Sequence, residues 1–150
     1  MDETTDPFEY FFDRPWSDGL PVVTPTAERI EWMLSGTSRE PDESLGGVPP
    51  AHNEATVEGV AQHAVMAGGR PDYLPALLGA VEAMLIEEFN INGLQGTMGP
   101  GGPMIIFNGP YAMKIGLHGG SGCFGPGFRA NATIGRAIRL ILMNLGGGLP

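Results

Sequence analysis

One cysteine and one histidine beside a glycine-rich loop are the residues best suited to chemistry in this sequence. Cys123 is the only cysteine in 150 residues, and His118 precedes it by five positions. A thiol next to a helix N-terminus ionises more readily, and a nearby imidazole can accept its proton. Cys123 is therefore the candidate nucleophile and His118 the candidate base. A buried cysteine that only packs is the alternative, and both interpretations stay open.

The loop around Cys123 has the composition of an anion site. The stretch from Gly116 to Leu142 reads GLHGGSGCFGPGFRANATIGRAIRLIL, so a glycine-dense loop runs into an apolar helix. Glycines let backbone amides approach a ligand, and a helix N-terminus adds unpaired N–H groups and partial positive charge. The residues expected to bind a small anionic substrate are Gly120, Ser121, Gly122, Arg129, Asn131, Arg136 and Asn108.

Each polar residue of this set has an expected role. Arg129 and Arg136 would hold a carboxylate or phosphate through their guanidinium groups, and Asn131 would cap the helix N-terminus. Loop amides would stabilise negative charge that develops during a reaction. The glycines match G-x-G-x-x-G, but no strand directly precedes them, so a dinucleotide site is not predicted. Close backbone packing is the structural alternative for the same glycines.

Charge divides the chain into two unlike halves. All 17 acidic residues lie at or before Glu88, and the charged residues beyond it are Lys114, Arg129, Arg136 and Arg139. The first 88 residues thus carry a formal net charge of −13 and the remaining 62 carry +4. An acid-free segment of this length indicates burial, an anionic ligand or an acidic partner surface. Four dispersed basic residues are too few to follow a phosphate backbone, which argues against nucleic acid.

Other features bound the class of protein. Hydrophobic residues make up 42% of the chain, yet none of its segments has the roughly 18 uninterrupted apolar residues that a membrane span needs. The N-terminus begins with acids rather than the basic start of a signal peptide, so a cytoplasmic location is expected. His52 and His63 are predicted to be exposed, and neither has neighbours at a metal-ligand spacing. A zinc site is therefore not expected and no metal ligands are assigned, and the sequence does not tell whether a metal or an organic cofactor is bound.

The chain is expected to form an acidic, aromatic arm over residues 1–19 and one α/β domain over residues 20–150. The arm concentrates aromatic side chains, which either pack on the domain or clasp another subunit; these are Phe8, Tyr10, Phe11, Phe12 and Trp16. Within the domain, Glu82 is the one acid inside an otherwise apolar predicted helix. It is either a base or ligand, or it lies on a stripe that reaches solvent.

Periodicity predicts the elements of that domain. Helices are expected over residues 27–34, 54–68, 71–88 and 110–115, and a last helix is expected from about Asn131. Strands are expected over residues 20–23, 91–97 and 104–107, the last being the strongest, with a surface loop over residues 37–53. The predicted class is α/β, with a helical hairpin packed on a small sheet and a glycine-rich loop leading into a C-terminal helix.

Three strings of the sequence resemble the N-terminal part of larger bacterial proteins associated with the UGSC selenoprotein group. They are DGLPVVTPT (18–26), EATVEGVAQHAVMAGGRPDYLPALLGAVEAM (54–84) and GCFGPGFRANATIGRAIRL (122–140). The resemblance implies one half of a split protein, because the larger proteins continue beyond the point where this chain stops. A cysteine can occupy the position of Gly69 in that group, so the glycine here argues against two-cysteine redox chemistry.

Two functions follow as expectations. In the first, the chain is a subunit of a hetero-oligomeric enzyme that binds an anionic small molecule at the glycine-rich loop, with Cys123 as the reactive group. In the second, it is a non-catalytic partner subunit whose glycine-rich half forms an interface. Both require a second polypeptide, and no residue pattern assigns a reaction class.

Overall fold

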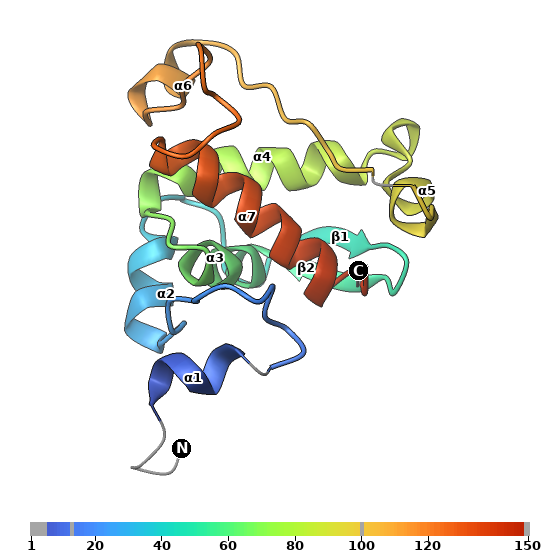
Figure 1. Ribbon diagram of the computed structural model, residues 1–150, viewed down its shortest axis with the longest axis horizontal. Helices are drawn as coiled ribbons and strands as arrows, with labels where there is room; N and C mark the ends of the chain where they lie inside the picture. The colour runs from blue at the N-terminus through green and yellow to red at the C-terminus, as the bar shows by residue number, and fades with distance from the viewer. Residues whose placement is uncertain (1–5, 13, 100, 149–150) are drawn as a thin grey trace.

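Three helices with apolar faces form the centre of the molecule. The computed structural model describes residues 6–12, 14–99 and 101–148. In Figure 1, helix α7 (Arg129–Asn144) crosses helices α3 (Val57–Met66) and α4 (Leu74–Leu85). Buried side chains recur along one face of α7 at helical spacing, at Ala130, Ile134, Ala137, Ile138 and Ile141. Each fully buried Ile or Leu contributes about 1.5–3 kcal/mol, so this packing is the main source of stability.

The remaining elements surround this centre. They are α1 (Pro7–Phe12), α2 (Ala27–Leu34), α5 (Ile91–Gly96), α6 (Pro110–Lys114), the 3-10 helices Pro71–Tyr73 and Glu87–Phe89, and strands β1 (Ser44–Val48) and β2 (Asn53–Thr56). The fold is helix-dominated α/β, with a helical hairpin beside one small sheet and a glycine-rich loop before the last helix, as predicted. None of the helices in the described ranges is long and apolar enough to cross a membrane.

The small sheet lies where the sequence predicted a loop. Strands β1 and β2 form an antiparallel hairpin in which Val48 pairs with Asn53 and Gly47 with Glu54. The predicted loop over residues 37–53 is therefore wrong at Ser44–Val48, which form strand β1. Adjacent glycines suggested a loop. In the hairpin, however, the backbone of Gly47 lies close to that of His52, and a Cβ at Gly47 would be 3.1 Å from the His52 carbonyl oxygen.

The three predicted strands are wrong. Residues 20–23 and 104–107 have no strand partner in the described parts of the chain, and Ile91–Gly96 is helix α5. Helix α5 begins because the Asn90 side chain, on a backbone with φ +50°, accepts from the Gly93 N–H at 3.1 Å. An apolar run has local strand preference, but a strand forms only when another backbone is present to pair with it.

The helix predictions are confirmed with shifted ends. Helix α2 has the predicted bounds and is capped by Thr26, whose hydroxyl accepts from the Arg29 N–H. Helix α3 starts at Val57 rather than residue 54, because residues 53–56 pair as β2. Helix α7 starts at Arg129, with Phe128 as its N-terminal cap residue, so the prediction that Asn131 caps it is wrong.

The described part of the N-terminal arm lies on its own chain. Phe11 is buried and its ring centroid is 5.3 Å from that of Trp16. Trp16 in turn accepts a hydrogen bond from the side chain of Asn144 in α7 through its backbone carbonyl. The side chain of Phe8 lies outside the described residues, as do residues 1–5 and 13. Burial in this chain's own core therefore accounts for part of the aromatic composition of the arm.

Two glycines provide a matched test of the packing. A Cβ at Gly36 would lie 2.6 Å from the carbonyl carbon of Pro71, whereas a Cβ at Gly79 in α4 meets no atom within 4 Å. We expect Gly36→Ala to lower the free energy of unfolding by about 1–3 kcal/mol through the clash. Gly79→Ala should raise it by roughly 0.5–1 kcal/mol through helix propensity. Urea unfolding of both variants measures this, and shifts of the same sign would contradict the structure.

Candidate functional site

The glycine-rich loop is fastened to helix α7 by one side chain. The Asn131 side-chain oxygen accepts from the His118 N–H at 2.9 Å. Its amide nitrogen donates to the carbonyl oxygens of His118 at 2.9 Å and Cys123 at 3.1 Å. Asn131 therefore joins the start and the middle of the loop to the first turn of α7, and this positions the two residues best suited to chemistry.

His118 and Cys123 lie in the same small loop. The His118 ring stacks on Phe128 with centroids 3.8 Å apart and an interplanar angle of 11°. Its Nε2 lies 3.1 Å from the Ser121 carbonyl oxygen, so this nitrogen carries the proton and donates it. Cys123 is half-buried, and its N–H donates to the carbonyl oxygen of Gly120 at 3.2 Å. The loop thus contains five of the predicted site residues, which are His118, Gly120, Ser121, Gly122 and Cys123.

Arg136 binds a carboxylate of its own chain. Its Nε and Nη2 donate to the two carboxylate oxygens of Asp18, each at 2.8 Å, and Nη2 also donates to the Leu20 carbonyl at 3.2 Å. The Asp18 side chain is only 12% exposed. The hydrogen bonds from Arg136 lower the pKa of Asp18, so the pair is charged at neutral pH. The anion at Arg136 is therefore this carboxylate.

Arg129 contacts backbone rather than a charged group. Its guanidinium donates to the Gly68 carbonyl at 3.1 and 3.0 Å and to the Gly69 carbonyl at 3.3 Å. These carbonyls follow the C-terminus of α3, where partial negative charge favours a cation. Asn108 is exposed and makes no hydrogen bond to any described residue. Of the predicted anion-binding set, both arginines and Asn131 are thus engaged within the chain.

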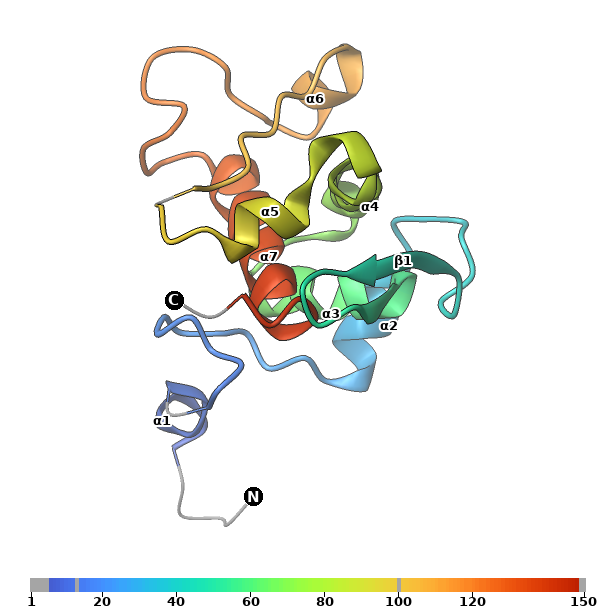
Figure 2. The same ribbon diagram turned by 90° about the vertical axis from the view of Figure 1, so that its right-hand side faces the viewer.

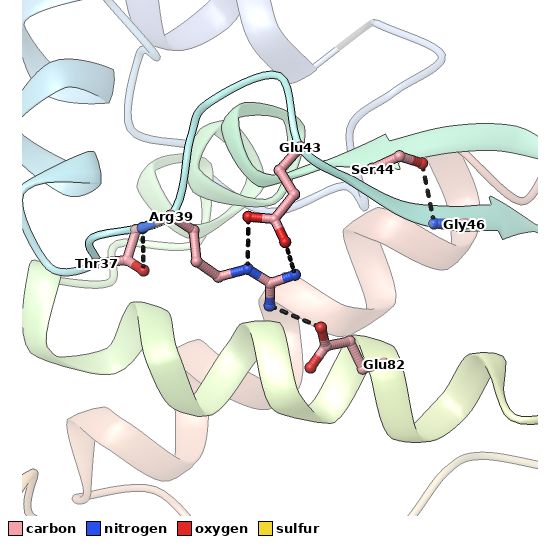
Figure 3. Close-up of polar contacts among 6 residues, drawn as sticks. All are labelled: Thr37, Arg39, Glu43, Ser44, Gly46 and Glu82. Atoms are coloured by element: carbon pink, nitrogen blue, oxygen red, sulfur yellow. Dashed lines mark hydrogen bonds and ion pairs between the residues drawn. The ribbon is translucent and has the colours of Figure 1, made fainter.

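Glu82 is held by an arginine at the surface. Figure 3 shows Arg39 between Glu43 and Glu82, with its Nη1 2.7 Å from Glu82 and its Nη2 2.8 Å from Glu43. The guanidinium lowers the pKa of Glu43, chiefly through its hydrogen bonds. The Glu82 side chain is 47% exposed. It therefore lies on a solvent-reaching stripe of α4 and fastens the segment before β1.

His63 is buried, contrary to the prediction that it is exposed. Its Nδ1 donates to the Gly59 carbonyl at 2.7 Å, and Asn144 donates to its Nε2 at 3.3 Å. Burial lowers the pKa of His63, and the Gly59 bond opposes this only in part. A neutral imidazole therefore joins α3 to α7 beneath the N-terminal arm. Among described residues, no three His, Cys, Asp or Glu side chains form a group that could hold a metal ion.

The sequence did not reveal the most exposed feature of this half. Large apolar side chains are exposed between residues 98 and 124, at Met98, Met104, Ile106, Tyr111, Met113 and Phe124. Figure 2 shows α6 and the glycine-rich loop extending beyond α4 and α7. Residues 101–108 run extended between α5 and α6 (Figure 1). These exposed apolar side chains make this stretch the place to look for an interaction surface.

Comparison of the chain with family models, curated proteins and solved structures finds no match.

Asn131→Asp tests how the loop is held. The variant keeps the acceptor for the His118 N–H, but it loses both donors and places a carboxylate against two carbonyl oxygens. We expect the loop to lose about 1–3 kcal/mol of local stability, so iodoacetamide should alkylate Cys123 faster. Asn108→Asp is the charge-matched control and should leave the alkylation rate unchanged. Equal rates in both variants would show that Asn131 does not hold the loop.

His63 predicts a pH dependence of stability. Below the unfolded-state pKa of 6.5, the unfolded chain binds a proton that the folded chain does not, because burial lowers the folded pKa. The free energy of unfolding should fall as pH decreases from 6.5 toward that folded pKa, with a slope approaching about 1.4 kcal/mol per pH unit. His63→Gln should remove this component, whereas His52→Gln should retain it. Chemical unfolding between pH 8 and 5 measures the free energy of unfolding at each pH. If its dependence on pH were the same in His63→Gln as in the wild type, His63 would not be the group responsible.

Proposed function

We propose that this chain is one subunit of a hetero-oligomer and that a second polypeptide docks on its glycine-rich half. One observation carries the proposal. Residues 102–108 are extended, and none of their backbone N–H or C=O groups makes a hydrogen bond to another described residue. We call residues 102–108 the open segment.

Side chains of the open segment alternate as in a strand with one face on a core. Ile105 and Phe107 pack against the hydrophobic core, whereas Met104 and Ile106 are 66% and 69% exposed. This alternation and the apolar composition favour a strand, and the chain supplies no partner for it within the described ranges. An unpaired apolar strand is a site for β-strand addition, in which a peptide from another chain supplies the missing hydrogen bonds.

Charge indicates the chemistry of the partner. Lys114 and Arg139 make no ion pair with any described residue, and no acid occurs after Glu88. A docking strand flanked by Asp or Glu side chains would complement the net positive charge of this acid-free half. Complementary charge of this kind selects a partner and speeds its association.

A second copy of the same chain fits this surface less well. A two-fold dimer would place the acid-free surface against itself and bring like charges together. Docking of an acidic half on the next copy's open segment would be a heterologous contact, which forms rings or filaments. A distinct polypeptide avoids both outcomes.

Catalysis by the assembly is the second candidate function. It is favoured by the loop in which Asn131 holds both His118 and Cys123. In this form of the proposal the partner supplies the groups that bind an anionic small molecule, because Arg129 and Arg136 are already engaged. Cys123→Ser would then abolish turnover while leaving the assembly intact. Turnover that persists in Cys123→Ser would assign the chain the non-catalytic role.

A pair of charge substitutions tests the docking surface. Met104→Glu with Ile106→Glu places two carboxylates on the outward face of the open segment, where they would repel an acidic partner, while Ile105 and Phe107 remain in place. Trp32→Glu is the control, because Trp32 is an exposed apolar residue, 53% exposed, on α2. Each protein is expressed in its native cells and purified under native conditions, and its assembly is weighed by native mass spectrometry.

We expect wild type and Trp32→Glu to retain one stoichiometric second polypeptide. The double variant should lose it and keep the same circular dichroism spectrum, because its changes lie at the surface. A wild-type protein without a second polypeptide would overturn the proposal. So would a double variant that retains the partner in full stoichiometry.

A further inference from the structure

A cavity of about 560 Å³ lies between helix α5, residues 97–99, 101–103 and 105, and helix α7. Its walls combine glycine backbone with aliphatic side chains, which include Ile91, Leu94, Ile105, Ile138 and Leu142. Pockets for small molecules commonly have volumes of roughly 300–1,000 Å³ and are mostly apolar with a few polar groups. The cavity therefore has the size and the lining of a ligand site. It is separate from the loop that contains Cys123 and His118.

Helix α7 presents bare backbone to this cavity. Gly135 lines it, and a Cβ built at Gly135 would meet no atom within 4 Å. A glycine inside a helix is about 1 kcal/mol less favourable than alanine, and internal packing does not require one here. The space above Gly135 lets a bound molecule reach the surface of the helix. Gly79 in α4 has the same open space but does not line this cavity, so it serves as a control.

One cation lines the cavity without a carboxylate. Arg139 follows Gly135 by one helical turn, is exposed, and makes no hydrogen bond or ion pair with a described residue. The arginines at positions 39, 70 and 136 each have a carboxylate partner. Among the described residues, no Asp or Glu lines the cavity. Its electrostatics therefore favour an anion, and its walls favour hydrocarbon.

We infer that this cavity binds a small carboxylate with an aliphatic body. The Arg139 guanidinium pairs with the carboxylate, and the hydrocarbon lies on Gly135 and the aliphatic walls. A guanidinium and a carboxylate form charge-assisted hydrogen bonds, which are about twice as strong as neutral ones. The aliphatic part adds affinity in proportion to the apolar area that it buries. The lining residues belong to this chain, and Gly102, Pro103 and Ile105 also lie in the open segment, so the site is tested on the isolated chain.

Titration of the isolated chain with octanoate tests the inference, followed by isothermal calorimetry and by protein NMR shifts. Octan-1-ol and octylammonium are the matched probes, because they keep the hydrocarbon and remove or reverse the charge. We expect octanoate to bind at least about tenfold more tightly than octan-1-ol, as charge-assisted bonding implies. Octylammonium should bind most weakly.

Two variants locate the site, each with a control. Arg139→Gln should weaken octanoate binding at least about tenfold and bring it to the level of octan-1-ol. Lys114→Gln removes a cation of the same half outside the cavity and should change nothing. Gly135→Leu should fill the cavity and block the binding of octanoate and octan-1-ol. Gly79→Leu should leave the binding of both molecules unchanged.

Several results would overturn the inference. They are absence of octanoate binding at millimolar concentration, equal affinity for octanoate and octan-1-ol, or unchanged binding in Arg139→Gln. Arg139 is exposed, so its variant should fold even if Gly135→Leu does not, and the charge test then decides. Because the isolated chain is used, failure here leaves the docking proposal standing, and loss of the partner leaves this inference standing.

Discussion

Burial of one face of helix α7 against α3 and α4 is the interaction on which the other features depend. The helix is apolar on that face and uses its remaining positions for separate contacts. Asn131 holds the glycine-rich loop, Arg136 binds Asp18 of the N-terminal arm, and Gly135 and Arg139 border the aliphatic cavity. Loss of the α7 packing would therefore release the loop, the arm and the cavity wall together.

The charge asymmetry of the sequence has a structural explanation in two parts. Two cations of the acid-free half have partners within the chain. Arg136 forms an ion pair with Asp18, and Arg129 donates hydrogen bonds to backbone carbonyl oxygens. Lys114 and Arg139 have no such partner among the described residues. The asymmetry thus combines contacts between the two halves with two cations that the described chain leaves without a carboxylate.

The local spacing of apolar and turn residues predicted most of the helices. It did not predict the contacts between residues far apart in the sequence. Helix α2 and the hairpin of α3 and α4 follow from apolar spacing and turn residues, which act within a few positions. Arg136 and Asp18 are 118 positions apart, so no spacing rule could show that a carboxylate occupies the predicted anion binder. Residues 104–107 have strand preference, but pairing depends on a second backbone that the described chain does not supply. Asn131 likewise acts across the loop, where capping rules do not apply.

Hydrogen exchange of the open segment tests the central claim most directly. Backbone amides of residues 102–108 are compared between the native assembly purified from its source and the isolated chain, residue by residue, by NMR or mass spectrometry. The docking proposal predicts rapid exchange in the isolated chain and strong protection of alternate amides in the assembly, because a partner strand would bond every second residue. Equal exchange in both preparations would contradict it.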